Sequence, residues 1–109
     1  MKIPGTYRKL REELLAGDYS VEENTRSYIS KGKDSRDFNV YIEIFEEEAL
    51  ERARKLDQKL KADHNSIGPL FGMVVSIKDV LCYKGHGVTA GSKILQGFKS
   101  AFTATAVQR

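Results

Sequence analysis

The chain has 109 residues, of which 40% are hydrophobic and 30% charged, a composition typical of one small domain without a membrane-spanning segment. Its net charge of +3 is small and its basic and acidic residues are interspersed, so charge alone does not indicate a nucleic-acid surface. The single cysteine, Cys82, excludes an internal disulfide, and with no secretory signal it favours a cytoplasmic protein.

Two helices are expected at the start of the chain. Apolar residues recur at helical spacing from residue 7 to residue 15, and Gly17 is a natural stop after them. Ser20 and Glu23 have the spacing of a capping box, which predicts the start of a second helix. A polar connection follows over residues 31–37. We therefore expect residues 1–37 to form an N-terminal helical region, arranged as a helical hairpin.

A strand and a long helix are expected next. Apolar and polar residues alternate from Phe38 to Phe45, as they do in a half-buried strand. The strongest helical pattern of the chain then runs from Glu46 to about Asp63. Its exposed side has acid–base pairs four residues apart, which are typical of a solvated helix face. These pairs are Glu48–Arg52, Glu51–Lys55 and Asp57–Lys61.

A second strand, buried on both faces, is predicted from Gly72 to Ile77, because most of its residues are apolar or glycine. A glycine-rich segment with one short helix around Ser92–Leu95 follows. This order indicates an α/β fold whose second domain begins in residues 38–109. A two-faced strand needs sheet neighbours that this sequence does not supply. We therefore expect the domain to be incomplete, as the N-terminal piece of a longer protein.

Lys78 is the candidate catalytic residue. It follows the predicted buried strand, where burial would disfavour the charged ammonium form of its side chain. A lysine must be neutral to accept a proton, so this position suits a general base. The alternative is a lysine whose side chain reaches back to water, and position alone favours that alternative. The motifs around Lys78 reverse this preference.

Several short motifs resemble the amidase signature family. The Gly68–Gly72 and Ile77–Asp79 motifs would fit almost any member of that family. The Lys84-Gly85 motif, with Cys82 before it, and the Thr89–Leu95 motif are similar to the A subunits of glutamyl/aspartyl-tRNA amidotransferases. The motifs are, in order, Gly68-Pro69-Leu70-Phe71-Gly72, Ile77-Lys78-Asp79, Lys84-Gly85, Thr89-Ala90-Gly91-Ser92-Lys93-Ile94-Leu95 and Ala104-Thr105-Ala106-Val107.

This resemblance implies a fold and a mechanism. The fold is a mixed sheet, of which residues 38–109 hold the first strands and helix. The chemistry uses a serine–cis-serine–lysine triad, in which Lys78 is the base and an acyl-enzyme forms on the nucleophilic serine. In that family both serines lie in a loop rich in glycine and serine, and no such loop occurs in this sequence. We expect them beyond Arg109, and we expect the 109-residue chain alone to be inactive.

The resemblance also implies partners. Subunits of this type hydrolyse glutamine and pass ammonia to a second subunit, which uses ATP and Mg²⁺ to convert Glu-tRNA(Gln) or Asp-tRNA(Asn) to Gln-tRNA or Asn-tRNA. A small third subunit completes a hetero-trimer, and the tRNA is bound mainly by the second subunit. This chain itself is expected to bind no cofactor and no metal. Two alternatives stay open: a stand-alone amidase for small amides, and a non-catalytic interaction fragment.

Other polar residues near the candidate base have simpler interpretations. Ser76 would lie on the same side of the strand as the base, but packing in the place of a valine explains it. Ser92 either lines the active-site wall or caps a helix, and Asp79 orients a neighbouring loop through hydrogen bonds. His86 lies in a stretch that only loosely resembles a dinucleotide-binding motif. The histidines and Cys82 do not have the spacing of a zinc site.

Overall fold

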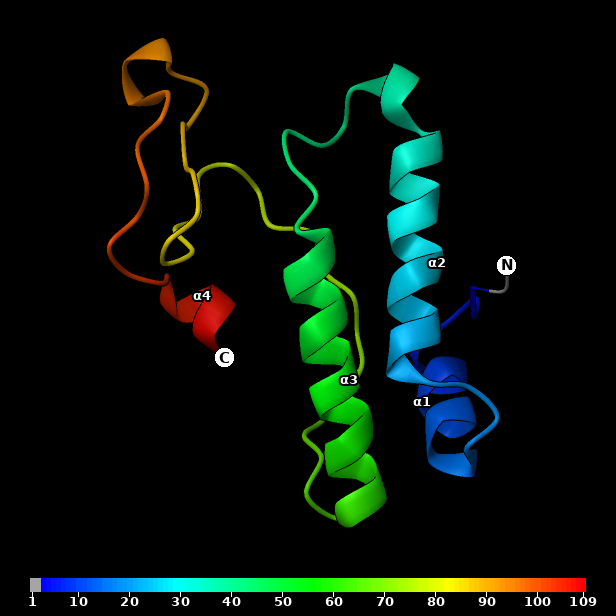
Figure 1. The fold of residues 1–109 in the computed structure, drawn as a ribbon. Helices are drawn as coiled ribbons and strands as arrows, with labels where there is room; N and C mark the ends of the chain where they lie inside the picture. The colour runs from blue at the N-terminus through cyan, green and yellow to red at the C-terminus, as the bar shows by residue number, and fades with distance from the viewer. Residues whose placement is uncertain (1–2) are drawn as a thin grey trace. The chain divides into compact units, whose positions relative to one another are not determined.

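The computed structural model describes residues 3–109. They divide into two compact units, Met1–Val74 and Val75–Arg109. The domain boundary predicted between residues 37 and 38 stays a prediction. No helix within residues 3–109 is both long and apolar enough to cross a lipid bilayer. The elements in chain order (Figure 1) are α1 (Tyr7–Ala16), α2 (Val21–Asp34), the 3-10 helix η1 (Arg36–Phe38), α3 (Glu46–Ala62), the 3-10 helix η2 (Lys93–Leu95) and α4 (Thr105–Gln108).

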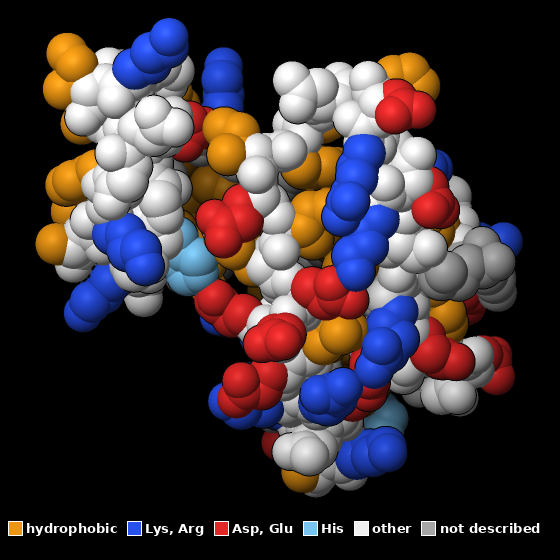
Figure 2. Space-filling model, turned by 45° about the horizontal axis from the view of Figure 1, so that its top comes forward, with side chains coloured by type: hydrophobic (Ala, Val, Ile, Leu, Met, Phe, Trp, Pro, Cys, Tyr) orange, Lys and Arg blue, Asp and Glu red, His pale blue; other side chains and the backbone are white. Residues whose placement is uncertain are grey.

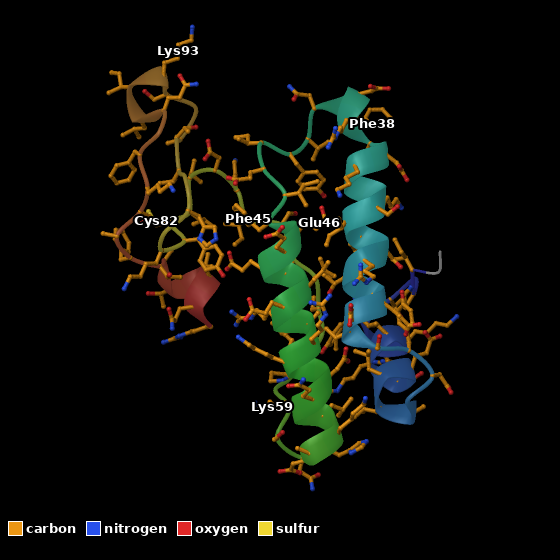
Figure 3. All side chains as sticks on the ribbon, in the orientation of Figure 1. Phe38, Phe45, Glu46, Lys59, Cys82 and Lys93 are labelled. Atoms are coloured by element: carbon orange, nitrogen blue, oxygen red, sulfur yellow. The ribbon has the colours of Figure 1, made fainter. Side chains whose placement is uncertain are left out.

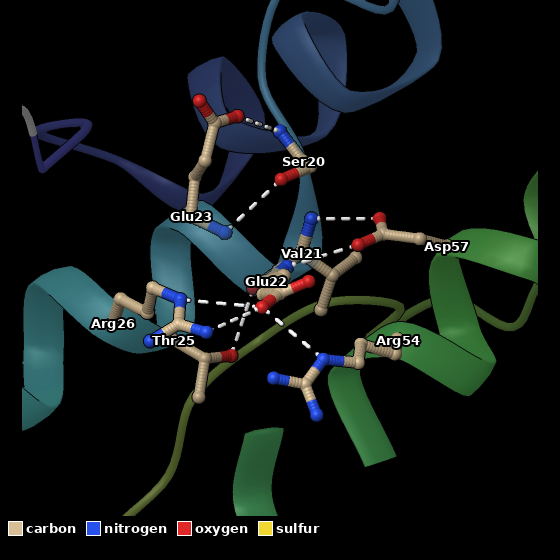
Figure 4. Close-up of polar contacts among 8 residues, drawn as sticks. All are labelled: Ser20, Val21, Glu22, Glu23, Thr25, Arg26, Arg54 and Asp57. Carbon is tan, nitrogen blue, oxygen red and sulfur yellow. Dashed lines mark hydrogen bonds and ion pairs between the residues drawn. The ribbon is translucent and has the colours of Figure 1, made fainter. Parts of the chain in front are cut away.

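The end of α1 and the start of α2 confirm the predictions made from local sequence signals. The Thr6 hydroxyl accepts a hydrogen bond from the backbone of α1, and Gly17 ends that helix in the left-handed conformation with φ 78°. At the start of α2, the Ser20 hydroxyl oxygen accepts from the Glu23 amide at 3.0 Å. The Glu23 carboxylate accepts from the Ser20 amide at 2.8 Å, which completes the capping box (Figure 4).

Packing of α2 on α3 organises the first unit, and the two helices run side by side in Figure 1. The Asp57 carboxylate of α3 accepts hydrogen bonds from the Val21 amide at 2.8 Å and the Glu22 amide at 3.0 Å. A negative side chain at this place satisfies free amides and complements the helix dipole of α2 (Figure 4). The buried core cluster beside it consists of Leu10, Leu14, Val21, Ala53, Leu60 and Phe71.

The charged pairs predicted on α3 are confirmed in part. Lys55 and Glu51 form an ion pair at 2.7 Å with both side chains largely exposed, as expected for a solvated face. Basic and acidic side chains are interspersed on the face shown in Figure 2. Asp57, which the spacing pairs with Lys61, instead binds the first amides of α2. Its role comes from a tertiary contact that local spacing does not reveal.

The strand predicted from Phe38 to Phe45 is wrong for this structure. The segment starts in η1 and continues without regular structure until α3 begins at Glu46 (Figure 3). Two of the side chains expected on the buried face are open to solvent, since Val40 is 64% exposed and Ile42 is 78% exposed, whereas Ile44 is half-buried. Alternation describes a side-chain pattern only, and a strand also needs a second backbone to bond with. Among the described residues, the backbone hydrogen bonds of this segment are local and join it to no second strand.

The strand predicted from Gly72 to Ile77 is also not formed. Gly72 lies in a turn with φ 74°, and residues 73–78 after it have no regular structure. Val75, expected to be buried, is 67% exposed. The sheet of the predicted α/β fold is therefore missing from residues 3–109, whose strand pairing is limited to an isolated antiparallel bridge between Gly87 and Lys99. The physical reason is that a two-faced strand has nothing to pack between here.

Candidate functional site

Lys78 lies at the start of a turn in the second unit, and its side chain is exposed. Its carbonyl oxygen accepts a hydrogen bond from the Leu81 amide at 2.9 Å. The expected burial of Lys78 is therefore wrong for this structure, because the strand that would have buried it is not formed. Its role as a catalytic base stays a prediction.

Asp79, the next residue, organises the loop that carries the Thr89-Ala90-Gly91 motif. One carboxylate oxygen accepts from the Thr89 amide at 2.9 Å and the other accepts from the Thr89 hydroxyl. The Ala90 amide donates to the Asp79 carbonyl at 2.9 Å, and Ala90 is held at φ 48°. The Thr89 hydroxyl and amide, with the Gly91 amide, lower the pKa of Asp79 against the opposing effect of burial. The prediction that Asp79 orients a neighbouring loop is confirmed.

The remaining polar candidates lie in the second unit, and two of them, Ser92 and His86, have a contact there. Ser92 caps η2, since its hydroxyl oxygen accepts from the Ile94 amide at 3.3 Å. Ser76 is exposed, so the packed position expected for it is not formed. Cys82 is a half-buried free thiol. The His86 ring stacks on a tyrosine at a centroid distance of 4.0 Å. Within residues 3–109 no three His, Cys, Asp or Glu side chains are grouped to hold a metal ion.

The Gly68–Gly72 motif belongs to the first unit, where side chains from α1 and α2 bind its backbone. The Tyr7 hydroxyl lies 2.7 Å from the Pro69 carbonyl oxygen and 3.0 Å from that of Phe71. The Arg11 guanidinium donates to the Gly68 carbonyl at 2.9 Å, and the Asn24 side-chain amide donates to the Gly72 carbonyl at 3.2 Å. We call Tyr7, Arg11 and Asn24 the carbonyl clamp.

The sequence analysis missed the clamp. Its members are separated from their partners by 48 to 64 residues in the chain, so no local spacing reveals them. One signal was present for Asn24, which is a polar residue at a position on the helix that the structure leaves 0% exposed. A buried side-chain amide requires hydrogen-bond partners, so an asparagine on the apolar side of a predicted helix indicates a specific contact.

Gly72 allows the loop to approach the core closely. A Cβ atom built on Gly72 would lie 2.7 Å from Leu14 Cδ1 and 3.2 Å from Val21 Cγ2. The 2.7 Å contact is shorter than van der Waals packing allows and the 3.2 Å contact is tight, and the φ of 74° already favours glycine. The clamp and the absence of a side chain at Gly72 together fix the path of this motif.

A groove of about 700 Å³ lies among α1, α2 and α3 of the first unit. Its lining includes Glu22, Arg54, Asp57 and His64, but no residue of the amidase-like motifs. Glu22 accepts from Arg26 at 2.7 Å and from Arg54 at 3.2 Å (Figure 4). The carboxylates and cations here bind one another and the start of α2, so the groove shows no set of convergent catalytic groups.

Comparison with known proteins gives a consistent result. The family model described as Amidase matches residues 23–109. The chain is 46% identical over 104 residues to the A subunit of glutamyl-tRNA(Gln) amidotransferase from Chlorobium chlorochromatii, covering 95% of this chain and 22% of that protein. It is 40% identical over 103 residues to the protein of the same name from Chlorobaculum tepidum, covering 94% of this chain and 21% of that protein. The chain thus spans about a fifth of the length of these relatives. No solved structure matches it.

Proposed function

Because the chain belongs to the amidase family, we propose that it is part of the glutamine-hydrolysing subunit of a tRNA-dependent amidotransferase. The observation that carries this proposal is the 46% identity to the A subunit of such an amidotransferase over 95% of the chain. That similarity covers 104 of 109 residues, so it includes α1, whereas the general family match starts only at residue 23. Similarity in α1 favours this subunit over a stand-alone amidase for small amides.

In the proposed reaction a serine oxygen attacks the side-chain amide carbon of glutamine, and the C–N bond breaks to release ammonia. Lys78 acts as the base, taking a proton through a second serine and returning it to the leaving nitrogen. Water then hydrolyses the acyl-enzyme to glutamate. The resemblance places both serines outside residues 1–109, so the 109-residue chain alone is expected to lack activity. What supports Lys78 is its place in the Ile77–Asp79 motif beside a loop ordered by Asp79.

The proposed fold requires the segment from Gly72 to Ile77 to become a strand once sheet neighbours are present. The support is its exposure pattern: Val75 is 67% exposed and Met73 is 38% exposed, although both are apolar. A sheet on either side would remove this apolar surface from water. Formation of the strand would also bring Lys78 to the strand end, where desolvation favours the neutral amine that a base needs.

The ammonia is proposed to pass to a second subunit that uses ATP and Mg²⁺ to amidate Glu-tRNA(Gln) or Asp-tRNA(Asn), with a small third subunit completing the complex. This part rests on the names of the relatives, which are amidotransferase subunits. The chain is proposed to act in the cytoplasm and to contact tRNA mainly through the second subunit. No cofactor is assigned to the chain itself.

The test uses the protein purified from its own source with whatever subunits accompany it. We expect ammonia release from glutamine, co-purification of two further subunits, and no ammonia release by the 109-residue chain alone. Hydrolysis of small amides without hydrolysis of glutamine would contradict the proposal and favour the stand-alone amidase. Glutamine hydrolysis by the isolated 109-residue chain would contradict the placement of the serines.

A further inference from the structure

The division of the chain into two units reveals a charge asymmetry that the net charge of the whole chain hides. Residues 75–109 contain five basic side chains and one acidic side chain, so this unit carries a net charge of +4. The whole chain carries +3, which leaves −1 for residues 1–74. The excess positive charge of the protein is therefore concentrated in the unit Val75–Arg109, the shorter of the two.

The basic side chains of this unit are exposed to solvent. They are Lys78, Lys84, Lys93, Lys99 and Arg109. Within residues 3–109 no ion pair joins any of them to an acidic side chain. The one acid of the unit, Asp79, accepts hydrogen bonds from the amide and the hydroxyl of Thr89. In Figure 3 the side chain of Lys93 extends outward from η2. The unit thus presents several cations whose charge nothing nearby neutralises.

These cations resist burial when further parts of the protein cover this unit. Removing an ammonium group from water is costly unless an anion accompanies it. The apolar side chain of Ile94, which is 92% exposed, carries no such cost and gains free energy when it is covered. We therefore expect Lys84, Lys93 and Lys99 to remain in contact with water or with a bound anion in the complete protein. Lys78 is set apart, because a base needs its neutral form.

We propose that Lys84, Lys93 and Lys99 form a direct contact for the phosphate backbone of tRNA. The proposal rests on the proposed function, in which a charged tRNA is the substrate of the complex, and it adds a contact made by this chain to those of the second subunit. Lysine ammonium groups bind phosphates as point charges and position a nucleic acid without reading its sequence.

Exposed aromatic rings between these lysines favour RNA over an acidic protein as the partner. Phe98 is 50% exposed and directly precedes Lys99, and Phe102 is 63% exposed three residues further on. Aromatic rings beside cations are the combination that proteins use to bind single-stranded nucleic acid, since the bases stack on the rings while the cations follow the phosphates.

The test removes two of the charges in the protein as it is isolated from its source with its subunits. Lys93→Gln and Lys99→Gln are combined in one variant, the glutamine pair. The matched control combines Lys59→Gln and Lys61→Gln, which removes the same charge from exposed side chains of α3. An arginine pair, Lys93→Arg with Lys99→Arg, keeps the charge. The Kd for tRNA purified from the same source is measured over a range of salt concentrations.

We expect the glutamine pair to weaken tRNA binding about tenfold at low salt. The slope of log K against log salt concentration should become shallower by about 2, because each lysine that contacts a phosphate contributes about 1 to it. The control pair and the arginine pair should keep the wild-type slope. A wild-type slope in the glutamine pair would overturn the proposal, and so would an equal loss in the control pair or in the arginine pair.

The same variants separate RNA from protein as the source of the anion. Loss of subunits from the glutamine pair with a wild-type tRNA slope would show that the lysines meet acidic side chains, which would overturn the proposal. Failure of the proposed function has a different signature, since the wild-type protein would then release no ammonia from glutamine. A tRNA slope that depends on Lys93 and Lys99 would still establish the contact in that case.

Discussion

Replacement of Gly72 by alanine tests how tightly the Gly68–Gly72 motif is built into the helical core. The new Cβ would lie 2.7 Å from Leu14 Cδ1 and 3.2 Å from Val21 Cγ2. Leu14 is only 2% exposed, so its side chain has little room to move away. Overpacking of this kind costs about 1–3 kcal/mol, and a left-handed backbone costs a non-glycine residue about 1–2 kcal/mol. We expect Gly72→Ala to lower the free energy of unfolding by about 2–5 kcal/mol.

Gly17→Ala separates the two contributions. Gly17 has φ 78°, close to the 74° of Gly72, but no atom lies within 4 Å of its built Cβ. Its substitution should therefore cost only the backbone part, about 1–2 kcal/mol. Urea unfolding followed by helical circular dichroism measures both variants. If Gly72→Ala costs no more than Gly17→Ala, the close approach of the motif to Leu14 is refuted.

Two further predictions concern the contacts within each unit. Asp57→Ala removes both acceptors from the first amides of α2 and should cost about 1–2 kcal/mol in urea unfolding. Glu51→Ala, which breaks an exposed ion pair on the same helix, should cost clearly less. Equal costs would contradict the cap. The pKa of Asp79 lies below its ordinary 3.8, so its stabilising bonds to Thr89 are fully present above pH 3.8 and are lost as pH falls through the lowered value. The Thr89 amide signal in NMR should follow this loss in the wild type and not in Asp79→Asn; the same titration in both would contradict the contact.

The helices were predictable because their signals are local. Gly17 and the Ser20–Glu23 capping box each act within a few residues, and the structure contains them as expected. Asp79 was also assigned correctly, since it bonds a loop close by in the sequence. Of the two roles left open for Ser92, the structure shows the helix cap. Short-range hydrogen bonds of this kind depend on residue type and spacing, which can be read directly along the chain.

The strands and the clamp could not be predicted in the same way. Alternating residues such as Val40 and Ile42 fit a strand, but pairing depends on a second backbone that residues 3–109 do not place beside them. Burial of Lys78 was inferred from the predicted strand Gly72–Ile77, which also lacks a partner backbone within residues 3–109, and Lys78 is exposed. The bond from Tyr7 to Phe71 spans 64 residues, so it follows from the packing of α1 against the core and not from any motif.

The central claim is that Lys78 is the base for glutamine hydrolysis, and its most direct test is the glutaminase rate of Lys78→Ala in the protein isolated with its subunits. We predict less than a few per cent of wild-type turnover, with normal folding and assembly. Lys78→Arg should fail equally, since a guanidinium stays charged at physiological pH and cannot accept the proton. Substantial turnover in either variant would contradict the assignment of Lys78 as the base.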